Sequence, residues 1–241
     1  MRTKTSIALL ISLTMGTAGL RAGGDCPQPQ AGAQTAPPDT LYDTAVEQGL
    51  RAVEAGELYL MVNKPAGVLT ATEDRRFPTV LDLLPEPLRR RGPGPVGRLD
   101  RDVTGLVLLT TDGQLAHRLI SPKWKAEKLY RARCQGKLTE ADAEAFAGGL
   151  VLSDLTAKPA GLEIIEAREA ESLADVTLTE GKFHQVKRMF AAVGHPLLAL
   201  ERRRIGGVAL DPALEPGEWR KLNEGEVDGL KELCGLTDHE E

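Results

Sequence analysis

Two continuous apolar runs constrain the fold of this 241-residue chain more than any other feature of its sequence. Leu58–Val62 and Gly105–Thr110 consist almost entirely of apolar residues and are bounded by polar ones. Runs this short, with turn signals beside them, are typical of buried strands rather than of helices. Further strands are predicted where apolar residues alternate or recur in short runs, at Lys128–Cys134, Leu162–Ile165 and Ala174–Thr179.

Helical patterns lie between these predicted strands. They cover Gln114–Ile120, a segment from Thr139 to Phe146, Phe183–Val193 and Asn223–Leu233. The second starts with a capping-box pattern, and the third places Phe183, Val186, Phe190 and Val193 on one apolar face. Because strands and helices are interspersed without strict alternation, the sequence predicts an α+β domain rather than a doubly wound sheet.

The first 55 residues differ from the rest of the chain. Residues 24–39 are rich in Pro, Gly, Gln and Ala, which is typical of a linker or a disordered stretch, and Leu41–Ala55 has the pattern of a short helix. We therefore expect an N-terminal segment over 1–55 and one main domain over 56–241. The apolar run Ile7–Leu13 after a basic start imitates a secretory signal peptide. The longer stretch Ser6–Leu20 is too short and too interrupted by Ser, Thr and Gly for a transmembrane helix.

Several chemistries find no support in the sequence. Its three cysteines are widely spaced and form no C-x-x-C pair, which argues against a disulfide framework or a zinc site and favours a reducing compartment. The sequence contains no P-loop and no G-x-S-x-G elbow, and its four histidines lack metal-ligand spacing. We therefore expect a cytoplasmic protein without a bound metal.

Charge is segregated along the chain. The net charge of -5 excludes a uniformly basic nucleic-acid binder, but six bases face one acid in residues 121–137 and again in 182–204. Acids dominate residues 138–180 and 224–241. This distribution fits either solvated faces or one anion-binding face. A Pro/Gly-rich loop leads into Val96–Gly105, which combines two aspartates with two arginines; such a segment is either a salt-bridged turn or a source of a catalytic carboxylate.

Four motifs, in this order, carry a resemblance to a known family. They are Asn63-Lys64-Pro65-x-Gly67-Val68, Gly97-Arg98-Leu99-Asp100-x-Asp102-x-Thr104-Gly105-Leu106, Glu127-Lys128-x-Tyr130 and Gly181-Lys182-Phe183-His184-Gln185-Val186-Lys187-Arg188-Met189-Phe190. From Leu58 to Glu226 the chain resembles the RsuA-like family of ribosomal RNA pseudouridine synthases. The segments 158–160, 202–208 and 214–220 are most similar to its small-subunit (16S) branch.

This resemblance implies a pseudouridine-synthase-type domain with a large mixed, mainly antiparallel sheet and a central cleft. It implies that Asp100 is the catalytic aspartate, that Tyr130 stacks on the target base, and that Lys187 pairs with the aspartate. The substrate-binding residues that it implies are Lys64, Arg98, Leu99, Lys128, His184, Gln185 and Arg188. Family members often begin with a basic S4-type domain; here that domain is predicted to be degenerate or absent.

The reaction implied by the resemblance is an isomerisation of uridine to pseudouridine, which requires no cofactor, metal or nucleotide energy source. The expected partner is 16S ribosomal RNA or a small-subunit precursor, the expected protein is a monomer, and no membrane is involved. Three alternatives stay open at this point. They are a large-subunit rRNA synthase, an RNA-binding or ribosome-assembly factor without turnover, and an exported binding protein.

Overall fold

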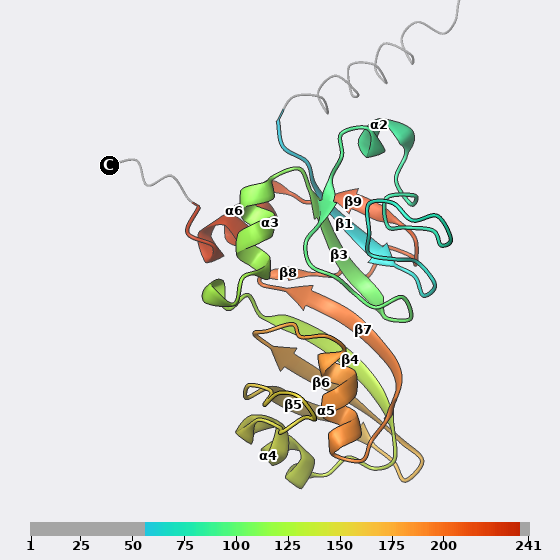
Figure 1. The fold of residues 1–241 in the computed structure, drawn as a ribbon, viewed down its shortest axis with the longest axis vertical. Coiled ribbons are helices and arrows are strands. Elements are labelled where there is room, and N and C mark those ends of the chain that lie inside the picture. The colour runs from blue at the N-terminus through green and yellow to red at the C-terminus, as the bar shows by residue number, and fades with distance from the viewer. Residues whose placement is uncertain (1–55, 237–241) are drawn as a thin grey trace, which may run out of the picture. The chain divides into compact units, whose positions relative to one another are not determined.

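The computed structural model describes residues 56–236, and these residues form a nine-stranded sheet with helices on both faces (Figure 1). The strand order along the sheet is β5-β6-β4-β7-β3-β1-β9, with β2 paired to β3 and β8 paired to β7. The strands are β1 (Tyr59–Lys64), β2 (Gly94–Pro95), β3 (Thr104–Thr110), β4 (Lys128–Gln135), β5 (Gly161–Ala167), β6 (Glu171–Leu178), β7 (Leu197–Ile205), β8 (Val208–Ala209) and β9 (Trp219–Lys221). All of these pairs are antiparallel except β3 with β7, so the predicted mixed, mainly antiparallel α+β sheet is confirmed.

The half of the sheet around β1 and β3 is buried on both faces. In β1, Leu60 and Val62 belong to one apolar cluster, while Met61 belongs to the cluster on the opposite face. The helices α3 (Gly113–Ile120) and α6 (Glu224–Leu233) cover that opposite face through residues such as Leu119 and Leu230. Burial on two faces explains why these two strands are continuous apolar runs in the sequence.

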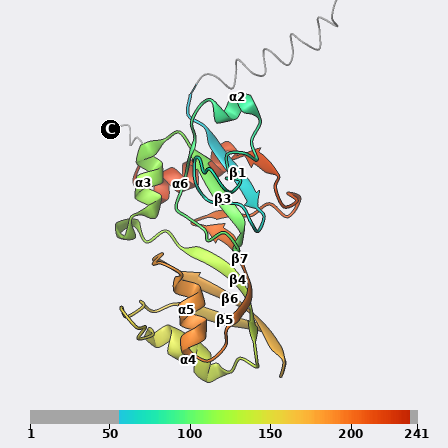
Figure 2. The same cartoon turned by 45° about the vertical axis from the view of Figure 1, so that its right-hand side comes forward.

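The half formed by β4, β5 and β6 is buried on one face. Its side chains alternate between buried and partly exposed along β4 and β6. The helices α4 (Glu140–Gly148) and α5 (Gln185–Ala192) cover the buried face (Figure 2). There Phe146 and Phe190 meet edge to face, with ring centroids 5.2 Å apart. On the other face Arg131 donates two hydrogen bonds to Asp175, at 2.9 and 2.8 Å. One covered face therefore produces the alternation seen in the sequence.

The two halves meet along the seam between β3 and β7. Their parallel ladder contains only the pairs Thr104 with Glu201 and Gly105 with Arg202. Gly105 has φ +96°, and a Cβ placed on it would lie 2.3 Å from the Arg202 carbonyl oxygen, so only glycine fits there. Beyond the ladder, the buried Arg202 side chain donates from Nε to the Leu106 carbonyl at 2.8 Å. A side chain thus continues the connection where backbone pairing stops.

Most of the helices lie where the sequence predicts them. The capping boxes of α4 (Thr139 with Asp142) and α6 (Asn223 with Glu226) are both present. The prediction for α5 is wrong at its start: the helix begins at Gln185, and Phe183 is 75% exposed instead of facing the core. Strand β7 was not predicted. Two short helices, α2 (Glu86–Arg89) and η1 (Pro122–Trp124), complete the described fold.

The predicted N-terminal segment and its helix over 41–55 lie outside the described residues. Among residues 56–236, no helix is long and apolar enough to cross a membrane.

Candidate active site

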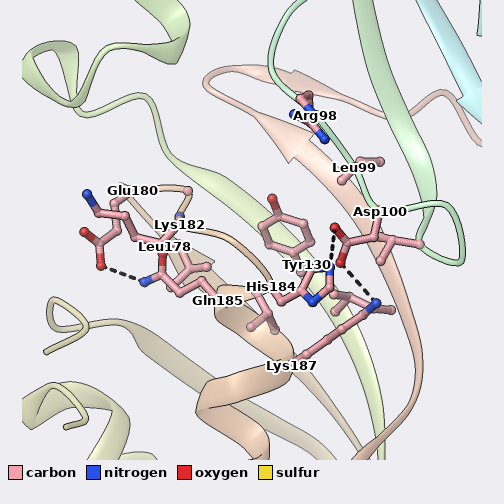
Figure 3. A pocket seen from close by; sticks show the side chains of 14 residues that line it. Arg98, Leu99, Asp100, Tyr130, Leu178, Glu180, Lys182, His184, Gln185 and Lys187 are labelled. Carbon is pink, nitrogen blue, oxygen red and sulfur yellow. Dashed lines mark hydrogen bonds and ion pairs between the residues drawn. The ribbon is translucent and has the colours of Figure 1, made fainter. Parts of the chain in front are cut away.

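A small pocket lies beside the seam of the sheet, where elements from both halves contribute side chains (Figure 3). Its volume is about 80 Å³. The loop before β3 supplies Arg98, Leu99, Asp100 and Val103; β4, β6 and β7 supply Tyr130, Leu178 and Leu200; and residues 180–187 supply the rest. Residues far apart in the sequence, and singled out there in separate motifs, are thus brought into one site.

A buried lysine, Lys64, supports the loop that carries Asp100. The Lys64 side chain is fully buried, and its Nζ donates to the carbonyls of Pro65 at 3.0 Å, Arg101 at 3.1 Å and Val103 at 2.6 Å. Burial lowers the pKa of Lys64 to about 8, although the carboxylates of Asp102 and Asp100 oppose this change. Two of these hydrogen bonds fix the backbone on both sides of residue 102, and the third holds the carbonyl of Pro65, next to Lys64 in the chain.

A second support holds the start of the same loop. Thr70 Oγ1 donates to the Leu99 carbonyl at 3.0 Å and accepts from the Leu99 amide at 3.1 Å. Gly67 donates its amide to the Arg101 carbonyl at 2.8 Å, and the Arg101 guanidinium lies 4.4 Å from the centroid of the Phe77 ring. These contacts leave the Asp100 backbone with little freedom, so its carboxylate is aimed by the surrounding structure.

The Asp100 carboxylate faces two nitrogen groups from the start of α5 (Figure 3). Lys187 Nζ lies 3.0 Å from one oxygen, and His184 Nε2 lies 3.3 Å from the other. The Asp100 side chain is 28% exposed, so the carboxylate is paired but still open to the pocket. A carboxylate with these neighbours can act as a nucleophile or as a base.

Lys187 also binds a second carboxylate. Its Nζ donates to both oxygens of Asp102, at 2.7 and 2.9 Å. Burial works against the charge of Lys187, but hydrogen bonds to Asp102 and Asp100 outweigh it and raise the pKa of the lysine above its ordinary value. The hydrogen bond from Lys187 likewise lowers the pKa of Asp102. Lys187 is therefore a cation over the whole neutral range.

Other predicted residues line the same pocket. Tyr130 is 8% exposed and lies on β4, and Leu99 is buried beside it in the apolar cluster. Gln185 is buried; its Nε2 donates to Glu180 Oε1 at 2.6 Å, and its Oε1 accepts from the Lys182 amide at 2.9 Å. Gln185 thereby fixes the turn that leads into α5.

Three predicted substrate-binding residues lie elsewhere. Lys64 is in the interior with all three N–H donors on carbonyls, so direct contact with a substrate is ruled out by its burial. Lys128 donates to the Ala126 carbonyl at 2.9 Å and does not line the pocket. Arg188 is turned away from it toward Asp154. The resemblance also implies that Lys64 supports the catalytic loop, and its three hydrogen bonds give it that position.

The sequence interpretation missed some residues in and around the pocket. Asp102 and Glu180 were not assigned a role, although one bridges to Lys187 and the other to Gln185. Lys182 also lines the pocket with an exposed side chain. For Asp102 a signal was present, because it stands two positions after Asp100 in the same loop. Glu180 gave no such signal, because it directly follows a predicted strand in an acidic region.

Comparisons with known proteins agree with this geometry. Residues 58–192 match the family model of RNA pseudouridylate synthase. The chain is 47% identical over 176 residues to the uncharacterized RNA pseudouridine synthase YtzG of Bacillus subtilis, covering 73% of this chain and 74% of that protein. It is 45% identical over 189 residues to the ribosomal small subunit pseudouridine synthase A of Escherichia coli, covering 77% and 79%.

A solved structure leads to the same class. The crystal structure of a pseudouridylate synthase superposes with a TM-score of 0.68 at 41% identity, covering 73% of this chain and 74% of that one. The fold and the pocket define an enzyme that isomerises a nucleoside within RNA. The chain belongs to the RNA pseudouridine synthase family.

Proposed function

We propose that this protein converts a uridine of 16S ribosomal RNA into pseudouridine, with Asp100 as the carboxylate that acts on the target nucleotide. The observation that carries the proposal is the position of Asp100: it lies in the pocket, on a loop fixed by Lys64 and Thr70, and between the nitrogen groups of Lys187 and His184. The small-subunit assignment is supported by 45% identity to the E. coli enzyme of that name.

The proposed chemistry rearranges one nucleotide. The bond from ribose C1′ to uracil N1 breaks, the base turns, and C5 joins C1′; C5 loses its hydrogen and N1 gains one. Asp100 attacks C1′ or removes a proton from the sugar. Lys187 holds a fixed positive charge 3.0 Å from that carboxylate. Tyr130, on the wall of the pocket, stacks on the turned base.

The remaining residues take supporting roles in the proposal. Leu99 shapes the wall beside Asp100, while Arg98 and His184 lie at the exposed edge, where a phosphate or the base can reach them. We also propose that the catalytic domain covers residues 56–241, that the enzyme acts as a monomer, and that it works in the cytoplasm, where its rRNA substrate is made.

The experiment that tests the proposal maps pseudouridines in 16S and 23S RNA incubated with the purified protein. The wild type should form pseudouridine at one uridine of 16S RNA, and Asp100→Asn should form none. Asp228→Asn is the matched control, because Asp228 is exposed on α6 and does not line the active-site pocket. It should behave like the wild type.

Each alternative gives a different result in this experiment. Pseudouridine only in 23S RNA would replace the small-subunit assignment with a large-subunit one. If wild type and Asp100→Asn were equally inactive but bound the RNA and rescued a deletion strain equally, a ribosome-assembly role would replace catalysis by this chain.

A further inference from the structure

Two aromatic rings stack at the edge of the active-site pocket. The rings of Phe183 and His184 have centroids 3.8 Å apart and planes inclined by 19°. The inner ring, His184, contacts the Asp100 carboxylate through Nε2 at 3.3 Å. The outer ring, Phe183, is 75% exposed. The Asp100 carboxylate, the His184 ring and the Phe183 ring therefore follow one another from the pocket to the solvent.

The backbone is arranged to produce this stack. His184 has φ +49°, in the left-handed region that few residues other than glycine adopt. It stands directly before the first residue of α5. Such conformations persist only where the surrounding structure enforces them, and they cluster at functional sites. Here the turn directs Phe183 outward, against the helical periodicity that would have buried it on the apolar face with Val186 and Phe190.

Exposure of this ring has no explanation in the packing of the domain. A phenylalanine that is three-quarters exposed gives up the burial that normally places it in a core. One face of the Phe183 ring is covered by His184, and the other is open. An aromatic ring with one covered face and one open face is the form of side chain on which an unpaired nucleobase stacks.

We infer that Phe183 is a stacking platform for the base next to the target uridine. The pocket is small, at about 80 Å³, and Phe183 is not among the residues that line it, so a base on the Phe183 ring lies outside the pocket. The exposed ring stands at that position, two groups away from Asp100. The exposed Lys182 lies beside it in the chain and provides a cation for the connecting phosphate.

The platform has a defined purpose in the reaction. A uridine must leave its stack to reach the pocket, which costs free energy and leaves its neighbour without a stacking partner. A ring that replaces the lost partner offsets part of this cost. The inference rests on the proposed RNA substrate, but it concerns the neighbouring base and not the chemistry at C1′.

The test combines changes in the protein with changes in the RNA. Phe183→Ala should lower kcat/KM about 5- to 150-fold, the range expected for loss of one base-aromatic stack. Phe183→Tyr keeps a flat ring and should keep the wild-type value, whereas Phe183→Leu keeps an apolar side chain without a ring and should behave like Phe183→Ala. Ile165→Ala, at an exposed apolar residue on β5, is the matched control and should leave kcat/KM unchanged.

The second part of the experiment changes the RNA. The base on each side of the target uridine is removed in turn, which leaves an abasic nucleotide at that position. At one of the two positions, the wild type should lose activity to the level of Phe183→Ala, while Phe183→Ala should lose nothing further. If Phe183 only packs against His184, Phe183→Ala will lose the same factor on intact and abasic RNA, and the inference is overturned.

The failure of the platform can be told apart from the failure of the proposed function. If Phe183→Ala modifies 16S RNA as fast as the wild type, the platform alone is wrong. If the wild type modifies a 23S uridine and leaves 16S RNA unmodified, the small-subunit assignment is wrong, and the same cycle on the 23S site decides the platform.

Discussion

At the scale of single residues, the site is organised by two lysines with opposite environments. Lys187 lies between two carboxylates and is held in its charged form, whereas Lys64 is buried under the loop and has a lowered pKa. In the proposed mechanism the first supplies a fixed charge beside Asp100, and the second fixes the backbone of the loop. Both act on the loop that carries Asp100, but their removal should have different consequences.

Asp102→Asn tests whether Lys187 depends on both of its carboxylate partners, Asp100 and Asp102. Because the hydrogen bond to Asp102 helps to raise the pKa of Lys187, its loss should lower that pKa. We expect kcat/KM to fall about 2- to 5-fold, which is the range for loss of a partly exposed ion pair. We also expect the decline of kcat/KM at high pH to begin at a lower pH in the variant than in the wild type. Measuring kcat/KM from pH 6 to pH 10 checks both effects. A profile identical to that of the wild type would show that Asp100 alone holds Lys187.

Lys64→Met tests the buried ammonium group. The pKa of Lys64 is about 8 in the folded protein, against an ordinary value of 10.5 that applies to the unfolded chain. At pH values between the two, the unfolded chain keeps a proton on Lys64 that the folded protein has lost, so raising the pH favours folding. The free energy of unfolding of the wild type, relative to that of Lys64→Met, should therefore rise by about 1–3 kcal/mol from pH 7.5 to pH 10.5. Urea unfolding at a series of pH values measures this difference. A constant difference would mean that the pKa of Lys64 is not lowered.

At the scale of secondary-structure elements, the decisive feature is the seam between β3 and β7. A ladder of two residue pairs joins the two halves of the sheet, and the Arg202 side chain extends it. The active-site pocket draws residues from both halves, so the geometry of the site depends on this narrow connection. Gly105 is the residue that makes the close approach of the two strands possible.

Gly105→Ala should therefore destabilise the protein more than a glycine replacement elsewhere. The new Cβ would meet backbone atoms of Arg202, which cannot move aside as a flexible side-chain end can, and φ at residue 105 is +96°. We expect a loss of about 2–4 kcal/mol in the free energy of unfolding. Gly113→Ala, at the open first position of α3, is the control and should change stability by less than about 1 kcal/mol. Equal effects of the two variants in urea unfolding would contradict the role of the seam.

The elements also show how far the sequence predicts this structure. Strands β1 and β3 were predictable because burial on two faces leaves an unbroken apolar run, and α6 because Asn223 and Glu226 form a capping box. Strand β7 was missed because its second half, from Glu201 to Arg204, has the composition of a charged surface run. Arg202 is in fact buried at the seam, a position that depends on a partner strand about a hundred residues away.

The candidate site was predictable in a similar, partial way. The motifs identified Asp100, Tyr130 and Lys187, all of which line the pocket, but a resemblance of sequence does not show which way a side chain points. Periodicity placed Phe183 in the core, and the left-handed turn at His184 places it outside. That turn is held by the hydrogen bonds of Gln185 with Lys182 and Glu180, which an analysis of apolar periodicity does not detect.

At the scale of the whole molecule, the net charge of -5 is a poor guide to the surface that meets RNA. The pocket is bordered by Arg98, Lys182, His184 and Lys187, whereas acids are concentrated in the strands β5 and β6 and in α4. Phosphate binding depends on this local arrangement and on the release of counterions, not on the total charge.

RNA binding should consequently weaken with salt despite the acidic composition. A plot of log affinity against log salt concentration should have a negative slope, and Arg98→Gln and Lys182→Gln should each make that slope shallower by about 0.7–0.9. Lys221→Gln, at an exposed lysine on β9 outside the pocket, is the matched control and should leave it unchanged. If Arg98→Gln and Lys182→Gln have the same slope as Lys221→Gln and the wild type, the RNA phosphates lie on another surface.

From the short seam we expect a particular order of refolding for this enzyme. Strands β4 to β7 are consecutive in the chain and pair with one another, whereas the seam joins β3 to β7 across that whole segment, and Lys187 meets Asp102 across 85 positions. Closure of a long loop is entropically costly and slows folding. Strand signal in refolding experiments should therefore return before catalysis does, and the time course of recovered activity should follow the closing of the seam.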